Sequence, residues 1–371
     1  MSWEFPTGGW LARVVRYLGR FGVLFLIFLV GYGVGGWVSQ WWFIPRWAKE
    51  RVKEASERIG EKSGELFVPL GLAGTTVPFL AFLPGARLLA GAGREAVWVF
   101  RNQGQGWMAE RAVKLGAGVT GGAMVAGGFV LGSFGEGLVY LPAEAGRPRR
   151  LARGPVHVYQ MAVLGGSLCS VLVASWEGVW CVEESTEGPE VKPVMAGFRA
   201  TGIAVNPATQ RVYWAGSDGR VFGAGLGHGP EGGWGFVQVE EFDTLSPGVT
   251  SLCWWASEDV LLAGQWGRSY VLRGAAWVRW TASRGGSERD LRLLACPQGG
   301  SERAWVVDAS WDSRRAWFGL VSMGGEARWW STQELFIPVT ALEDGVGQGT
   351  VILGTMGRGF VQFHGLSQGV K

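Results

Sequence analysis

The sequence has little of the residue types that carry catalysis or bind metals. Its 371 residues include three histidines and four cysteines. His157, His228 and His364 stand at unrelated places along the chain, whereas a zinc site needs three or four converging ligands. A serine-hydrolase elbow, a phosphate-binding glycine loop and a metalloprotease His-Glu pattern are also missing. We therefore expect no catalytic residues, no metal and no cofactor, and we expect that the chain is not an enzyme.

The four cysteines form no metal-binding or redox motif. They stand at positions 169, 181, 253 and 296, without a Cys-x-x-Cys pair. Cys169 and Cys181 flank one expected hairpin turn, where they could face each other, and the sequence leaves that pairing open. The favoured interpretation is that all four are buried free thiols.

A charge excess of one sign is missing too. The formal net charge is +3, and the repeats described next contain no basic block, so we expect no nucleic-acid partner. Glycine (62 residues) and tryptophan (22) are abundant instead. Glycine is typical of turns, and tryptophan is typical of strands in which large side chains fill the space between sheets.

One short phrase recurs from about residue 64 onward. It consists of an apolar run, a small residue, a glycine-containing turn and a second apolar run, which is the pattern of a β-hairpin. Aligned on the small residue, seven copies fall at Gly91, Gly132, Ala174, Gly216, Gly264, Ala309 and Gly354, at intervals by subtraction of 41, 42, 42, 48, 45 and 45. A period of about 40–50 residues predicts four-stranded propeller blades. We therefore expect an all-β, seven-bladed β-propeller over residues 64–371.

The two ends of this region are expected to meet. The chain stops soon after the third strand of the last copy, and Glu65–Leu70 has no other role in the pattern. We expect residues 64–70 to close the last blade as its outer strand, since an open ring leaves unpaired edges. Pro69 is acceptable there because an outermost strand is an edge.

The hairpin phrase Leu-Gly-Ser-Phe-Gly-Glu-Gly-Leu-Val (131–139) is similar to repeats of ligand-binding sensor and two-component-regulator propellers. The repeat region as a whole resembles the β-propeller superfamily, WD40-like propellers included. The regular Gly-His and Trp-Asp dipeptides of true WD40 repeats are absent, and Trp311-Asp312 is isolated. The resemblance therefore implies a fold and no particular activity.

A membrane segment precedes the repeats. Residues 21–44 contain no charged side chain over 24 positions, or about 36 Å of helix, which is enough to cross a hydrocarbon core of about 30 Å. Trp41, Trp42 and Trp47 cluster at its far end, where indole rings favour the membrane–water interface. We predict a single transmembrane helix in a lipid bilayer.

The flanks of this helix suggest further contacts. Gly31 and Gly35 lie four residues apart on one helix face and could pack against a partner helix; the alternative is that they face lipid. Residues 1–20 form an arginine-bearing amphipathic segment, either an interfacial helix or an organelle-targeting sequence. Residues 45–63 are expected to form a helical stalk.

The number of basic residues on each side of segment 21–44 predicts the side of the membrane on which the repeats lie. Four basic residues lie within 46–53 and three within 13–20. The positive-inside rule thus places the repeats on the cytoplasm-like side by a margin of one residue. For the membrane itself, an organelle inner membrane (mitochondrial) is favoured over a bacterial cytoplasmic membrane.

Large apolar residues recur beside the hairpin turns. Two positions after the aligned small residue, five of the seven copies carry one: Phe134, Trp176, Trp266, Trp311 and Met356. These side chains could form a docking face for a partner. The alternative is that each packs onto the next blade.

Two functions remain open. The leading hypothesis is a non-catalytic scaffold or accessory subunit of a larger membrane complex, possibly a respiratory one, with the propeller as a protein-interaction platform. Its partners would be other subunits, bound through the transmembrane helix and the propeller face. The alternative is a membrane-anchored sensor propeller that binds a small ligand in its central channel, although inner strands such as Thr201–Val205 are small and apolar.

Overall fold

The computed structural model describes residues 67–72, 75–83, 87–92, 96–102, 107–143, 146–164, 169–228, 233–265, 267–297, 301–309, 316–332, 337–343, 351–356 and 359–363. The chain divides into two compact units, Met1–Gly64 and Glu65–Lys371, and only the second contains described residues. The predictions for segments 1–20, 21–44 and 45–63, with Gly31, Gly35, Trp41, Trp42 and Trp47, therefore lie outside the described residues. In the ranges given above, no helix has the length and apolar character needed to span a bilayer.

The second unit consists of antiparallel sheets. Five have four strands each, and one has eight. The first three are β2 (Phe79–Leu83), β3 (Arg87–Ala92), β4 (Ala96–Asn102), β5 (Trp107–Lys114); β6 (Val119–Val125), β7 (Gly128–Ser133), β8 (Gly137–Pro142), β9 (Arg149–Arg150); and β10 (Val158–Val163), β11 (Val171–Ser175), β12 (Gly178–Ser185), β13 (Gly188–Ala196).

The next sheet comprises β14 (Ala200–Asn206), β15 (Arg211–Gly216), β16 (Val221–His228) and β17 (Trp234–Phe242). The eight-stranded sheet comprises β18 (Val249–Trp255), β19 (Val260–Gln265), β20 (Arg268–Arg273), β21 (Ala276–Arg284), β22 (Ser287–Leu293), β23 (Arg303–Asp308), β24 (Trp317–Ser322) and β25 (Ala327–Ser331). The last sheet holds β26 (Ile337–Glu343), β27 (Val351–Met356), β28 (Phe360–Phe363) and β1 (Phe67–Gly71).

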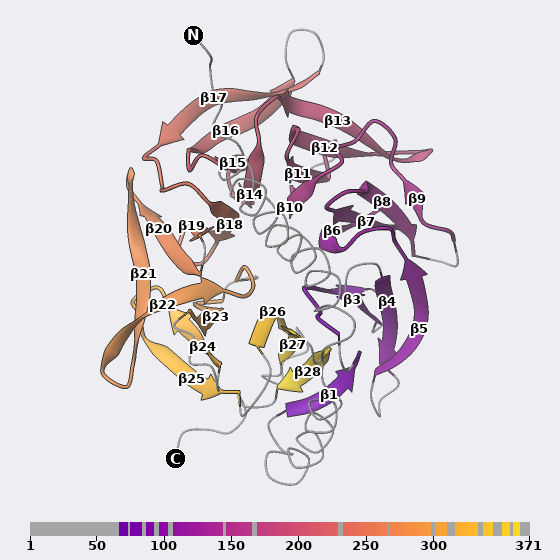
Figure 1. Cartoon of the computed structure of the whole chain (residues 1–371). Helices are drawn as coiled ribbons and strands as arrows, with labels where there is room; N and C mark the ends of the chain where they lie inside the picture. The colour runs from indigo at the N-terminus through magenta and orange to yellow at the C-terminus, as the bar shows by residue number, and fades with distance from the viewer. Residues whose placement is uncertain are drawn as a thin grey trace, which may run out of the picture. The chain divides into compact units, whose positions relative to one another are not determined.

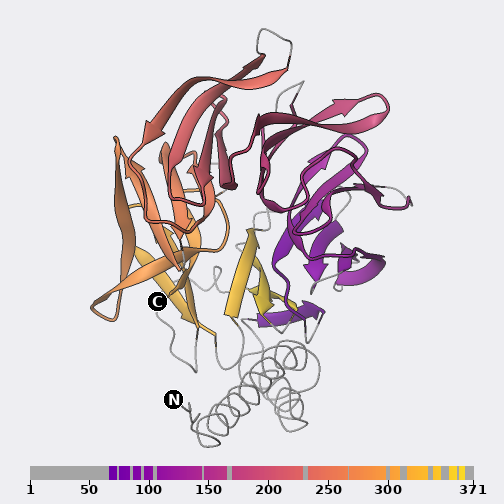
Figure 2. The same cartoon turned by 45° about the horizontal axis from the view of Figure 1, so that its top comes forward.

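The sheets follow one another around a common centre (Figures 1 and 2). The first strands of successive sheets are neighbours: β2 contacts β6, β6 contacts β10, β10 contacts β14, and β14 contacts β18. β26 of the last sheet also contacts β2 of the first. This is the radial arrangement of a β-propeller.

The start of this unit pairs with its end. β1 lies antiparallel beside β28, in a sheet whose strand order is β1-β28-β27-β26. This is the pairing that the sequence analysis expected for Glu65–Leu70. Pro69 stands opposite Val361 in the outermost strand, and an edge strand tolerates the missing N–H of proline.

Buried middle strands and aromatic side chains form the core between the sheets. Every residue of β7 and β11 is buried, because both faces of these strands are covered by neighbouring sheets. Trp214 and Trp255 are almost fully buried; Trp214 stacks on Phe236 at 4.0 Å, and Trp255 meets Trp280 edge-on at 5.5 Å. Burying one large apolar side chain contributes roughly 1.5–3 kcal/mol. Both of these ring contacts lie within a single sheet, and Trp214 also packs with Leu172 and Val179 of the preceding sheet. Tryptophan is therefore used in packing within the sheets and between them.

A side-chain hydroxyl and a glycine with positive φ stabilise the recurring hairpin turn. In three of the copies the residue after the aligned small residue is a buried Ser or Thr whose hydroxyl donates to a glycine carbonyl of the turn: Ser133 to Gly137, Ser175 to Gly178 and Thr355 to Gly359. At Gly137 φ is +76°, and an added Cβ would lie 2.1 Å from the Pro155 carbonyl oxygen. Only glycine allows the connection to the next sheet to pass this close to the turn.

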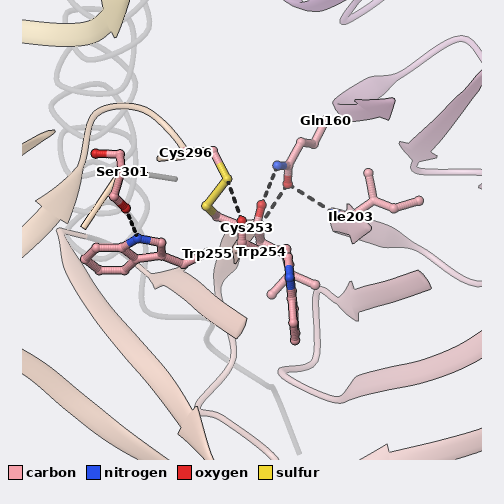
Figure 3. Close-up of a disulfide and its surroundings, with 8 residues drawn as sticks. Gln160, Ile203, Cys253, Trp254, Trp255, Cys296 and Ser301 are labelled. Carbon is pink, nitrogen blue, oxygen red and sulfur yellow. Dashed lines mark hydrogen bonds between the residues drawn. A yellow bond between two sulfur atoms is a disulfide. The ribbon is translucent and has the colours of Figure 1, made fainter. Parts of the chain in front are cut away.

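The prediction of four free thiols is wrong. Cys169 is bonded to Cys181, and Cys253 is bonded to Cys296, with Cα–Cα separations of 5.7 and 5.6 Å. The second bond, shown in Figure 3, joins β18 to the segment after β22, 43 positions further along the chain. Spacing in the sequence could not reveal this pair, because the two cysteines lie 43 positions apart and are brought together only when β18 packs beside the segment between β22 and β23.

Candidate interaction surface

Three of the five predicted docking residues are half exposed. The exposed fractions of Phe134, Trp176 and Met356 are 47, 48 and 47%. Trp266 and Trp311 lie outside the described residues. Phe134 lies in the turn between β7 and β8, Trp176 in the turn between β11 and β12, and Met356 ends β27.

Phe134 and Trp176 belong to one run of ring contacts. The Phe134 ring lies 4.8 Å from the His157 ring and 5.5 Å from the Tyr159 ring. His157 in turn lies 6.1 Å from Trp176. Because His157 directly precedes β10 and Tyr159 lies in it, the turn of one sheet packs at the start of the inner strand of the next.

Arg199 completes this run. Its guanidinium carbon lies 3.4 Å from the centre of the Trp176 ring, and its Nη2 donates to the Tyr159 hydroxyl at 2.8 Å. Stacking of arginine on an aromatic face adds a cation–π attraction to the hydrogen bond. We call the set Phe134, His157, Tyr159, Trp176 and Arg199 the aromatic–arginine patch.

Glu177 holds the histidine of the patch in place. A Glu177 carboxylate oxygen lies 2.9 Å from His157 Nδ1, and the other accepts the His157 backbone N–H at 3.4 Å. Partial burial acts to raise the pKa of the Glu177 carboxyl, but hydrogen bonds from the His157 ring and from backbone N–H groups outweigh it, so the pKa lies below its usual value. The carboxylate is therefore ionised and bound to His157 at neutral pH.

The next turn carries charges in place of the large apolar residue. Asp218 stands at the repeat position of Trp176 and pairs with Arg220 at 2.7 Å. The Arg220 guanidinium carbon lies 5.7 Å from the centre of the Phe198 ring. Phe198 directly precedes Arg199 in the chain. Beyond Arg199, the next turn thus presents a paired charge where the preceding turn presents Trp176.

The inner strand β10 departs from its counterparts in the other sheets. Five inner strands, β6, β10, β14, β18 and β26, have a β-bulge after their first or second residue. In three of them the bulged residue is a threonine whose hydroxyl donates to a carbonyl of the neighbouring strand: Thr120, Thr201 and Thr250. In β10 this residue is Tyr159, whose longer side chain reaches Arg199. Departures from a repeat are expected where a site is built.

The residue after this bulge is also exceptional in β10. Gln160 takes the place of Gly121, Gly202 and Ser251 in the neighbouring sheets. Its Oε1 accepts the N–H groups of Ile203 at 3.1 Å and Leu252 at 2.9 Å, and its Nε2 donates to the Leu252 carbonyl at 2.6 Å (Figure 3). One side-chain amide therefore joins the inner strands β10, β14 and β18.

Both interpretations of the apolar turn residues apply to Phe134 and Trp176. Each packs on the next sheet or on the connection leading to it, yet about half of each side chain stays exposed. Sequence reasoning missed His157, Tyr159, Glu177 and Arg199. A repeat comparison could have found two of them, since His157 lies 17 positions before Ala174 and Arg199 lies 17 before Gly216.

The described residues contain no group of three or more His, Cys, Asp or Glu side chains placed to hold a metal ion. Asp308, the last residue of β23, is a buried carboxylate paired with Arg284 at 2.9 Å.

Comparisons with known proteins identify a fold. No protein-family model matches the chain, and no curated protein matches its sequence. Among solved structures, the chain is similar to the β-propeller domain of Cps50 (Swd1) from Myceliophteria thermophila, with a TM-score of 0.57 and 12% sequence identity. The match covers 80% of this chain and 98% of that one. The repeat-containing part of the chain is thus a β-propeller.

Proposed function

We propose that the protein is a non-catalytic accessory subunit of a larger membrane complex, in which a seven-bladed propeller serves as the protein-interaction platform. Division of the eight-stranded sheet at the β21–β22 hairpin gives two four-stranded halves, so seven blades in total. The uncharged segment 21–44 supplies the membrane helix in this proposal, with Gly31 and Gly35 packing against a partner helix.

The aromatic–arginine patch is the observation that carries this proposal. Trp, Tyr and Arg are the residue types that contribute most to protein–protein affinity. Here Arg199 contacts both Trp176 and Tyr159 beside the hairpin turn, and Trp176 is 48% exposed. The part of Trp176 that stays in water would be covered by a partner protein.

The test is the native mass of the protein extracted from its own membrane in mild detergent, with mass spectrometry of the proteins that comigrate. We expect a stoichiometric set of membrane subunits with the wild-type chain. Trp176→Ala should release the propeller contact and lower the comigrating amounts. A single species near 40.0 kDa plus detergent contradicts the proposal.

Val163→Ala is the matched control. Val163 is 60% exposed and lies at the opposite end of β10 from Tyr159. Its replacement by alanine therefore removes exposed apolar surface without changing the patch. We expect it to leave the complex unchanged. Both variants should show the thermal unfolding of the wild type, because each truncated side chain is about half exposed or more.

A further inference from the structure

Arg199 is oriented by its neighbours and, within the part of the chain that the structure describes, pairs with no acidic side chain. One N–H bonds the Tyr159 hydroxyl, and the guanidinium plane is stacked on Trp176. No carboxylate of the described residues forms an ion pair with Arg199, whereas Arg220 in the next turn pairs with Asp218. The side chain is exposed, so its other N–H donors face water.

Glu177, the acidic residue next to the patch, is already bound to His157. Glu177 binds both the ring and the backbone N–H of His157. The patch therefore offers an unmatched, pre-oriented cation beside two half-exposed rings, Phe134 and Trp176. Arginine forks bind carboxylates through two parallel hydrogen bonds, and a pre-oriented fork loses less side-chain entropy in doing so.

We propose that the aromatic–arginine patch binds a peptide segment of a partner protein in which Asp or Glu stands beside an aromatic or large aliphatic residue. The carboxylate accepts N–H groups of Arg199, and the apolar neighbour packs on Phe134 and Trp176. This inference rests on the proposed role of the propeller as a protein-interaction platform.

The departure of β10 from the repeat supports this recognition. A threonine at position 159 would bond to the neighbouring strand, as Thr120, Thr201 and Thr250 do. Tyr159 instead carries its hydroxyl to Arg199. Tyr159 is thus a positioning residue, which fixes the direction of the guanidinium.

The experiment selects peptides from a phage-displayed random library on the purified full-length protein. Selected peptides should carry Asp or Glu next to Phe, Trp, Leu or Ile, and their affinity should fall as salt is raised. Arg199→Glu should weaken these peptides at least about tenfold, since it replaces attraction by like-charge repulsion. Tyr159→Phe should weaken them about two- to fivefold, because the guanidinium loses one of its two supports.

Arg273→Glu is the charge-matched control. Arg273 ends β20 on an exposed position of another sheet, and it should leave the affinities within about twofold. This inference is overturned if the selected peptides depend on Trp176 but show no preference for acidic residues. It is also overturned if they bind the Arg199→Glu variant as tightly as the wild type. Either result leaves the proposed function intact. A selection without any peptide sensitive to Trp176→Ala overturns both.

A second inference comes from the disulfides. All four cysteines of the chain are paired, two within the β10–β13 sheet and two between β18 and the segment after β22. Their Cα–Cα separations of 5.7 and 5.6 Å lie within the range of natural disulfides. Three of the four are also buried within the propeller core.

We infer that the propeller lies on an oxidising, non-cytoplasmic side of its membrane, where such bonds form and persist. Each bond forms as two thiols lose two protons and two electrons. A thiol-oxidising disulfide of that compartment accepts them and becomes a dithiol. This placement is opposite to that expected from the basic residues beside segment 21–44, whose margin is a single residue.

The test is thiol trapping in acid-quenched cells of the native host. Free thiols are first blocked with N-ethylmaleimide, and the protein is then reduced and labelled with a polyethylene glycol maleimide. We expect the gain of four labels after reduction and none in an unreduced sample. Blockage of all four cysteines before reduction would overturn the inference whatever the partners of the protein.

Discussion

Gln160 shows how much one side chain can contribute to this propeller. Its amide makes three hydrogen bonds to backbone groups of Ile203 and Leu252, in two neighbouring sheets. In β6, β14 and β18 the same position holds glycine or serine, at Gly121, Gly202 and Ser251, which cannot reach so far. Gln160 thus connects the inner strands β10, β14 and β18 through side-chain hydrogen bonds.

Replacement of Gln160 by methionine keeps the side-chain volume and removes these three bonds. The N–H of Ile203 and the polar groups of Leu252 lose their partner, so the free energy of unfolding should fall by about 1–3 kcal/mol. Urea denaturation measures the change. The neighbouring Tyr159→Phe should shift it by less than about 0.5 kcal/mol, and equal effects of the two variants would contradict the role of Gln160.

Glu177 should make the stability of the patch depend on pH. Its pKa in the folded protein lies below the ordinary value of 4.5, as burial is outweighed by hydrogen bonds from His157. A group with a lowered folded pKa stabilises the protein above its unfolded pKa, and that stability is lost as pH falls through the folded value. The stabilisation should therefore be complete above about pH 5 and disappear on acidification.

Thermal unfolding of Glu177→Gln tests this. At pH 7 the variant should be less stable than the wild type by up to about 1 kcal/mol, and the difference should shrink to nothing in strongly acidic buffer. Glu187→Gln, at an exposed turn position, serves as the control and should show no such pH dependence. A Glu177→Gln deficit that is constant with pH would refute the electrostatic origin.

At the scale of the single element, the hairpin turn explains the glycine of the repeat. At Gly219 φ is +93°, and an added Cβ would lie 2.0 Å from the Leu245 carbonyl oxygen, on the connection to the next sheet. The Leu245 N–H also donates to the Gly219 carbonyl at 3.0 Å. The turn and the connection are thus joined directly by backbone groups.

Gly219→Ala should destabilise the protein by more than about 1–3 kcal/mol, the cost of the positive φ, because the contact with Leu245 must also open. Gly235→Ala, on the outer strand β17, meets no atom within 4 Å and should be neutral. Chemical denaturation of the pair separates the two cases. Equal stability of both variants would show that the turn can move away from the connection.

The regular part of each element was predictable, and the exceptions to it were not. The repeat phrase predicts the middle strands and turns because burial of apolar residues and positive φ at glycine leave a mark in the sequence. The contact between Arg199 and Trp176 and the bond between Cys253 and Cys296 leave none, because each joins residues of different repeats that only the folded chain brings together. Tyr159 could be noticed only once the bulge register showed that threonine is the rule at its position.

At the scale of the whole molecule, the ring depends on the pairing of β1 with β28. Gln362 lies in β28 between Ile352 of β27 and Val68 of β1, so its strand has a neighbour on each side. Proline at this position removes an N–H from a strand inside the sheet, whereas Pro69 already occupies the edge strand.

Gln362→Pro should therefore open the ring at its closure, with a loss of at least about 1–3 kcal/mol and faster hydrogen exchange in β1. Pro69→Ala should change little. Hydrogen exchange followed by mass spectrometry reports on β1 directly. Unchanged protection of β1 in Gln362→Pro would show that the ring does not rely on this pairing.

The pairing of β1 with β28 also delays closure of the propeller during synthesis of the chain. β1 begins at Phe67 and its partner ends at Phe363, 296 positions later by subtraction. At about 5–20 residues per second, roughly 15–60 s pass before the ribosome has made the strand that β1 needs. Throughout that interval β1 has no partner strand. The emerging propeller would therefore need chaperones to protect this strand until β28 has been made.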